Sequence, residues 1–289
     1  MRILFILLQT VNILLFGHSY GVDSTEYLPE LAVSAGIENV YIGRFIKGNC
    51  SLEEHYAFFL ADSTKKYSEC LPGQTRFKKI DRTVREAVSG TRWDYVIFQN
   101  SLENEGRYET AQPWLDKLME YVLTTQKERF DNVPVIGWNM FWPISRLNED
   151  GHHKLSAYRL SFYGNSSDQM WNAYLAETKR LSKKTGITFI IPTGTAVMNA
   201  RRTSLNTVDA KELTRDGYHL SYDLGRYVAA CAVYEKILAP ISGRSVLGNE
   251  WRVVKKTLPE MTDKTATILQ RCAVAAVEKP FKLSKISEK

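Results

Sequence analysis

The sequence lacks the motifs of nucleotide-binding enzymes, the paired cysteines of zinc and redox sites, and the long apolar runs of membrane proteins. It contains neither a Gly-rich dinucleotide fingerprint nor a phosphate-binding P-loop, so it implies no nucleotide cofactor. Its four cysteines include no CxxC pair, which removes the ligand spacing of zinc and thioredoxin-like sites. No apolar run reaches the roughly 20 residues that a membrane-spanning helix needs. We therefore expect no cofactor, no metal site and no membrane span.

The cysteines are expected to be free thiols, with a Cys50–Cys70 disulfide as the alternative if the protein is exported. Residues 1–10 begin like a secretory signal, but no small-residue cleavage site follows them. They are interpreted as the remnant of an export signal or as the flank of a buried strand. Export is the favoured location and the cytoplasm is the alternative.

The charges give no sign of a nucleic-acid partner. The chain carries 38 Lys and Arg against 32 Asp and Glu, a formal charge of +6 over 289 residues. The basic residues are scattered, and the few dense runs are typical of a solvated surface. With 44% hydrophobic and 24% charged residues, the composition is that of a folded globular protein. Its length suffices for one large domain.

Short apolar runs rich in β-formers alternate with amphipathic helical patterns. The expected strands cover residues 11–16, 39–46, 95–99, 133–139 and 187–191, and the expected helices 25–35, 81–88, 111–125, 168–185 and 223–238. Continuous apolar strands that alternate with helices indicate a mainly parallel sheet covered on both faces. The sequence therefore predicts an α/β fold, a three-layer α/β/α sandwich, over residues 11–240. Residues 241–289 are expected to be a C-terminal extension that packs on the domain or trails it.

The first expected strand ends in a serine motif. Gly17-His18-Ser19-Tyr20-Gly21 matches the G-x-S-x-G pattern, which exposes a serine hydroxyl on a tight strand-to-helix turn. Parallel sheets place their sites at such strand ends. A glycine-rich turn without catalysis is the alternative. His18 is expected to point away from the crevice, with a contact to substrate as its alternative role.

A second motif, Arg215-Asp216-Gly217-Tyr218-His219-Leu220, precedes the last expected helix. A catalytic serine needs a base that takes its proton and a carboxylate that orients this base. Asp216 and His219 can supply both from one short loop. The alternative is that Asp216 and His219 are polar surface residues without a catalytic role.

In order along the chain, these blocks resemble the SGNH (GDSL-like) hydrolases, and in particular an uncharacterised subgroup with a GNSFS-like serine motif. The resemblance covers residues 11–238 and rests on residues 13–21, 48–55, 93–99, 191–196 and 216–221. It implies a flavodoxin-like SGNH hydrolase fold. It also implies Ser19 as the nucleophile, His219 as the general base and then acid, and Asp216 as the residue that orients His219.

The resemblance further implies an oxyanion hole with three donors. Two are the backbone N–H groups of Ser19 and Gly48, and the third is a side-chain amide after the third of the expected strands. The Gly-x-Asn-Asp of the family is absent there, and residues 99–104 read Gln-Asn-Ser-Leu-Glu-Asn instead.

Strict alignment puts Glu103 at the position of the amide, where a carboxylate would repel the oxyanion. Another amide must then serve if catalysis is intact. Asn100 is the first choice, Gln99 the second and Asn104 the third. One such donor lowers the barrier by about 3–4 kcal/mol.

Trp138, Met140 and Trp142 crowd the exit of the fourth expected strand. Alternate residues of a strand face opposite sides, so part of this set belongs to the core. The other part is a candidate substrate-binding platform on which a sugar ring stacks. Packing of the whole set is the alternative.

The favoured function is that of a serine esterase that acts on a small-molecule or glycan ester through an acyl-enzyme on Ser19. An O-acetyl or other O-acyl group on a carbohydrate is the favoured substrate, and this part rests on the resemblance alone. A lipase-like or thioesterase-like acyl hydrolase is one alternative. The other is a catalytically silent glycan-binding protein with the same fold, because residues 99–104 depart from the pattern of the family.

Overall fold

The computed structural model describes residues 10–151, 153–254 and 261–289. These residues fold around a seven-stranded sheet with the strand order β4-β3-β2-β1-β5-β6-β7. The strands are β1 (Val11–Phe16), β2 (Val40–Phe45), β3 (Lys65–Cys70), β4 (Lys78–Arg82), β5 (Tyr95–Phe98), β6 (Val135–Asn139) and β7 (Phe189–Ile191). Strands β2, β1, β5, β6 and β7 are parallel, whereas β3 pairs antiparallel with both β2 and β4.

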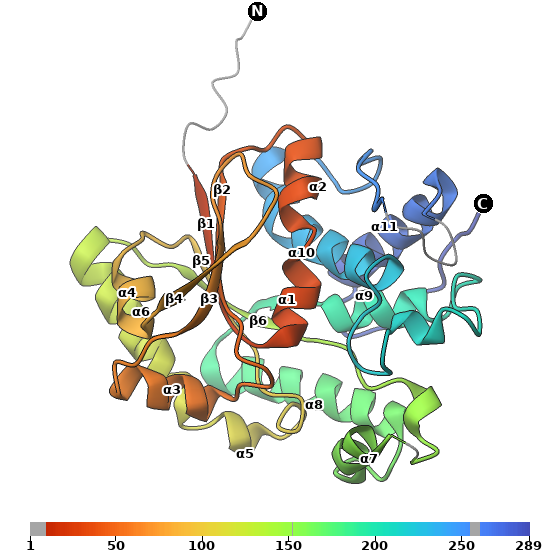
Figure 1. Ribbon diagram of the computed structural model, residues 1–289, viewed down its shortest axis with the longest axis horizontal. Helices are drawn as coiled ribbons and strands as arrows, with labels where there is room; N and C mark the ends of the chain where they lie inside the picture. Colours follow the sequence, from red (N-terminus) through yellow and green to blue (C-terminus); the bar gives the residue numbers. More distant parts are fainter. Residues whose placement is uncertain (1–9, 152, 255–260) are drawn as a thin grey trace, which may run out of the picture.

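Helices cover both faces of this sheet, which confirms the predicted α/β sandwich (Figure 1). One layer contains α3 (Leu52–Leu60), α4 (Val84–Ser89), α5 (Tyr108–Ala111), α6 (Trp114–Phe130) and α8 (Ser167–Thr185). The other contains α1 (Ser19–Thr25), α2 (Leu28–Ser34), α9 (Thr193–Ala200), α10 (Leu224–Ser242) and α11 (Asp263–Glu278). The short helix α7 (Lys154–Ser161) lies outside these layers.

The sequence predicts the five parallel strands but not the β3–β4 hairpin. Its strands read Lys-Lys-Tyr-Ser-Glu-Cys and Lys-Lys-Ile-Asp-Arg, and most of β4 is exposed. Charged residues of this kind are typical of edge strands, where they discourage pairing with another chain. The apolar signal that marks the central strands is therefore weak in this hairpin.

The carboxyl end of β1 is the point where the strand order reverses. The chain passes from β1 to β2 on one side and later returns as β5 on the other side. Such a reversal leaves a crevice at the carboxyl ends of the strands, and open α/β sheets bind ligands there. Ser19 begins the helix that leaves this crevice.

The C-terminal segment packs on the sandwich through α11, which contacts α9 and α10. Its last residues add hydrogen bonds, among them that from the Ser284 N–H to Asn199 Oδ1 (2.8 Å). The boundary expected at residue 240 falls inside α10. Residues 1–9 of the predicted export signal lie outside the described residues.

Two further expectations concern cysteines and membrane spans. All four cysteines are buried free thiols, so the alternative Cys50–Cys70 disulfide does not form. None of the helices in the described ranges is both long enough and apolar enough to cross a bilayer.

Candidate active site

The serine motif forms a tight turn between β1 and α1. His18 is the N-cap of α1, and its Nδ1 accepts the N–H of Tyr20 at 3.4 Å. Ser19 follows as the first helical residue and is partly exposed. A Cβ at Gly17 would lie 2.7 Å from Cδ of Gln99, so a larger residue at this position would displace the Gln99 side chain. The local sequence thus points the Ser19 side chain into the crevice.

The second motif is a loop closed by its own hydrogen bonds. Thr214 and Leu220 form an isolated antiparallel bridge, and the Arg215 N–H donates to the carbonyl oxygen of His219 at 3.0 Å. Asp216 Oδ1 accepts the N–H groups of Tyr218 (3.1 Å) and His219 (2.7 Å). These bonds fix the positions of the Asp216 carboxylate and the His219 imidazole relative to each other.

The fold brings Ser19, His219 and Asp216 into one line. His219 Nε2 lies 2.9 Å from Ser19 Oγ, and His219 Nδ1 lies 2.6 Å from Asp216 Oδ2. Burial raises the pKa of Asp216, but the hydrogen bonds from His219 outweigh this effect and the pKa lies below its ordinary value. A carboxylate at this position is therefore ionised at neutral pH and accepts the Nδ1–H of the imidazole.

A residue to which the sequence assigns no role, Asp23, ties the loop to the serine helix. Asp23 is fully buried and lies four residues after Ser19 on α1. Its Oδ2 accepts the N–H of Leu220 at 2.9 Å, and its carboxylate also accepts a guanidinium N–H of Arg215 (3.2 Å) and the Nε–H of Arg226 (2.8 Å). The i, i+4 spacing from Ser19 is the signal that could have drawn attention to it.

The large side chains at the end of β6 and just after it are buried and form no exposed platform. Trp138, Met140 and Trp142 have no exposed surface, so the predicted sugar-stacking role is wrong for all three. Trp142 stacks on Tyr20 with the ring centroids 4.3 Å apart, and its Nε1–H donates to the carbonyl oxygen of Tyr218 at 2.8 Å. Trp142 therefore braces the residue before His219.

Two backbone N–H groups near the crevice remain suited to an oxyanion. The Ser19 N–H is the first of α1 and has no acceptor within the helix. Gly48 follows β2, and a Cβ built on it would meet nothing within 4 Å, so open space adjoins its backbone.

The predicted amides after β5 turn inward. The Asn100 Nδ2 donates one N–H to Thr110 Oγ1 (3.0 Å), and Asn100 Oδ1 accepts the Ser101 N–H (2.9 Å), so both ends of this amide already bond other residues. Asn104 accepts a guanidinium N–H of Arg107 at 2.8 Å. None of these bonds, nor any other in the described part of the chain, joins either amide to Ser19.

Gln99 lies beneath the serine turn, where its side chain occupies the space beside Gly17 and Gly21. Its Oε1 accepts the Nδ2–H of Asn139 at 3.2 Å, whereas its buried Nε2 has no partner among the described residues. Of the three amides, Gln99 is the one that contacts the serine turn and has a nitrogen without a described partner.

Glu103 does not present a bare negative charge to the site. Its Oε1 accepts the Nε–H of Arg159 at 3.0 Å, and its Oε2 accepts the Nδ2–H of Asn49. The other end of the Asn49 amide accepts the N–H of Leu102 at 2.9 Å. The repulsion expected from a carboxylate at this position is therefore largely neutralised.

Two buried histidines hold the serine turn from below. His18 Nε2 lies 2.9 Å from the carbonyl oxygen of Asn100, and His55 Nε2 lies 3.0 Å from that of Gly17. Burial lowers the pKa of His18 to about 3 and that of His55 to about 4, so both are neutral at physiological pH. His18 points away from the crevice, as the sequence analysis expects.

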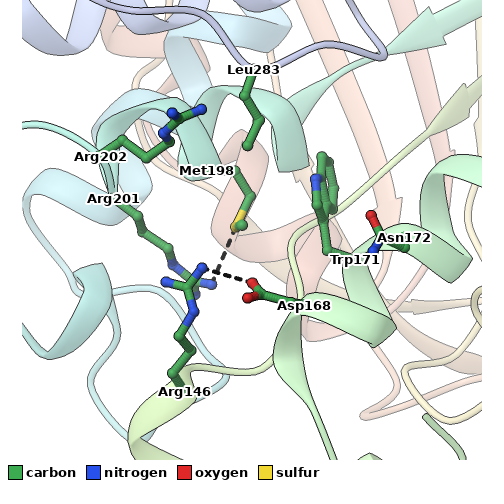
Figure 2. A pocket seen from close by; sticks show the side chains of 8 residues that line it. All are labelled: Arg146, Asp168, Trp171, Asn172, Met198, Arg201, Arg202 and Leu283. Carbon is green, nitrogen blue, oxygen red and sulfur yellow. Dashed lines mark hydrogen bonds and ion pairs between the residues drawn. The ribbon is translucent and has the colours of Figure 1, made fainter. Parts of the chain in front are cut away.

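Two cavities near the loop are rich in arginine. One, of about 340 Å³, includes Ser19 in its wall together with four cationic side chains. The other, of about 370 Å³, is drawn in Figure 2, and its lining includes none of Ser19, His219 and Asp216. There Arg146 forms ion pairs with Asp168 (2.7 Å) and Glu212 (3.1 Å).

Among the described residues, no three His, Cys, Asp or Glu side chains gather to hold a metal ion.

Comparison with known proteins gives a family and a fold. The model of a family described as a domain of unknown function, DUF4886, matches residues 12–271. A DUF4886 family protein from Bacteroides uniformis ATCC 8492, known from a crystal structure, is 26% identical with a TM-score of 0.79, and the match covers 96% of this chain and 98% of that protein. No curated protein matches.

Two more distant structures are hydrolases by description. A candidate SGNH hydrolase from Slackia heliotrinireducens is 17% identical with a TM-score of 0.50, over 79% of this chain and all of the other. This likeness confirms the SGNH-like fold and concerns the fold alone. An acetylxylan esterase from Geobacillus stearothermophilus, solved as a catalytic mutant, is 13% identical with a TM-score of 0.43, over 86% of this chain and all of the esterase.

Proposed function

The chain belongs to this family of unknown function, and from its site we propose that it is a serine esterase of the SGNH type. The observation that carries the proposal is the line from Ser19 Oγ to His219 Nε2 (2.9 Å) and from His219 Nδ1 to Asp216 Oδ2 (2.6 Å). This is the geometry that a hydroxyl needs in order to lose its proton to a base as it attacks a carbonyl.

The reaction has two stages. In the first, Ser19 Oγ attacks the ester carbonyl while His219 takes the hydroxyl proton, and His219 then donates this proton to the leaving alcohol. In the second, His219 takes a proton from water, the hydroxide attacks the acyl-enzyme, and the carboxylic acid leaves as Ser19 recovers its proton. Asp216 holds the imidazole in the required tautomer and stabilises its cation.

The oxyanion is assigned to the backbone N–H groups of Ser19 and Gly48, with Gln99 as the amide in the third position. Gln99 is preferred to Asn100 because its Nε2 has no described partner and lies at the serine turn, whereas the Asn100 amide bonds Thr110.

A small acyl group, such as the acetyl group of a carbohydrate ester, fits the site better than a long acyl chain. The cavity that adjoins Ser19 has charged walls, so it offers no apolar trough for a long acyl chain. A lipase-like enzyme would need an apolar trough at the same place. The irregular residues 99–104 motivate the other candidate, a silent glycan-binding protein.

Hydrolysis of 4-nitrophenyl acetate and of longer 4-nitrophenyl esters tests the proposal. We expect acetate to be the better substrate, and Ser19→Ala to lower kcat by at least about 10³-fold. Ser24→Ala is the matched control, because Ser24 lies on the same helix and donates to the carbonyl oxygen of Gly21. Activity that survives Ser19→Ala would refute the nucleophile. A folded wild-type protein that hydrolyses no ester would favour the silent glycan-binding protein.

A further inference from the structure

We propose that the alcohol part of the natural ester carries a carboxylate, which binds in the cationic cavity beside Ser19. The inference rests on the proposed esterase activity and adds the chemical class of the substrate. With about 340 Å³, the cavity is within the size range of small-molecule sites, and an acetyl group would fill only a small part of it. The space next to the nucleophile therefore suits the larger part of an ester.

The cavity wall carries a surplus of positive charge. Four cations line it, namely Arg44 from β2, Lys79 from β4, Arg215 from the loop and Arg226 from α10, against two carboxylates. Its formal net charge is thus +2. Four different parts of the chain supply the cations, so the cluster is a product of the fold.

Both carboxylates are already engaged. Asp23 is fully buried and bonds Arg215 and Arg226, as described above. Glu26 forms an ion pair with Arg44 at 2.7 Å. Neither acid is left to neutralise the remaining charge, so an anion from outside would be attracted to the cavity.

Lys79 is the cation that the protein leaves uncompensated. No ion pair joins it to a carboxylate of the described residues, and its side chain is exposed at the rim of the cavity. A charged edge strand also discourages aggregation, and Lys78 would serve that role equally well. Successive side chains of a strand point to opposite faces, however, and only Lys79 lines the cavity.

Lys78 and Lys79 therefore provide a matched pair of variants. The experiment measures kcat/KM for 4-acetoxybenzoate, which carries a carboxylate, and for neutral 4-acetoxybenzamide, each divided by the rate of the uncatalysed reaction. For the wild-type protein we expect the ratio of the anionic to the neutral ester to exceed one and to fall as NaCl is added. Lys79→Met should lower this ratio about three- to tenfold. Lys78→Met should leave it as in the wild-type protein.

The outcomes separate the two proposals. Hydrolysis of the neutral ester that depends on Ser19, with a ratio of one or less, would refute the carboxylate and leave the esterase intact. Equal ratios for Lys78→Met and Lys79→Met would also overturn the role of the cavity. The absence of Ser19-dependent hydrolysis of either ester would refute the esterase and, with it, this inference.

Discussion

The loop with Asp216 and His219 and the segment 99–104 both lie at the crevice, yet they use their polar side chains in opposite ways. In the loop, backbone hydrogen bonds hold the carboxylate and the imidazole toward Ser19. In the segment, Asn100 and Glu103 turn to Thr110 and Arg159. A position at the end of a strand therefore does not decide the role of a side chain; its available partners do.

The largest loss of activity is expected from a substitution inside the loop. Asp216→Asn should lower kcat by about 10³- to 10⁴-fold, because an amide no longer fixes the imidazole in the tautomer that accepts the serine proton. Steady-state hydrolysis of 4-nitrophenyl acetate measures the effect, and circular dichroism shows whether the variant is folded. A loss of less than tenfold in a folded variant would mean that Asp216 does not orient His219.

The attachment of the loop can be broken without touching the three aligned side chains. Asp23→Asn should lower the free energy of unfolding by about 3 kcal/mol or more, because Arg215 and Arg226 lose a buried partner. Urea unfolding measures it. Asp81→Asn is the control, since the exposed pair of Asp81 with Lys66 contributes less than about 1 kcal/mol. Equal effects of the two substitutions would contradict the anchoring role.

Acid should loosen segment 99–104 and the serine turn through the buried histidines, because His18 bonds the carbonyl of Asn100 and His55 bonds that of Gly17. Their pKa values in the folded protein are about 3 and about 4, below the unfolded value near 6.5, so the unfolded chain binds more protons below pH 6.5. The stability is thus full above pH 6.5 and declines as the pH falls toward 4.

Each of these histidines should contribute a slope of about 1.4 kcal/mol per pH unit to the free energy of unfolding in that window. His55→Gln retains an N–H for the Gly17 carbonyl and removes the titration. Urea unfolding at several pH values should therefore give a shallower slope for this variant than for the wild-type protein. An unchanged slope would show that His55 is not held neutral by the fold.

The smallest effect on activity is expected in segment 99–104. Asn100→Ala should change kcat less than about threefold while it costs about 1–3 kcal/mol of stability, because its amide bonds Thr110 and Ser101. An oxyanion donor would instead cost about 10²- to 10³-fold in kcat. A fall of that size for Asn100→Ala, with Gln99→Ala unaffected, would reverse the assignment.

Local patterns in the sequence predict the parts of the molecule that local forces determine. The apolar runs predict the five parallel strands, and hydrogen bonds within the compact loop from Thr214 to Leu220 set Asp216 and His219 relative to each other. The meeting of that loop with Ser19 follows from the resemblance, since no spacing along the chain shows contact between residues 200 positions apart.

Other features depend on partners far along the chain and were not predictable in this way. The burial of Trp142 depends on Tyr20 and on the loop, and Glu103 is neutralised by Arg159 from α7. In the sequence nothing distinguishes Asp23 from other acidic residues on helices, because its partners Arg215 and Arg226 are about 200 residues away. The β3–β4 hairpin was not predictable either, because its polar strands lack the apolar pattern that marks the central strands.

The central claim is that His219 activates Ser19 as a nucleophile. A fluorophosphonate probe, which forms a covalent bond with activated serines, tests this directly when the labelled protein is digested and analysed by mass spectrometry. We predict a single adduct on the peptide that contains Ser19, and its loss in folded His219→Ala. An adduct on another serine, or equal labelling of Ser19 without His219, would contradict the account.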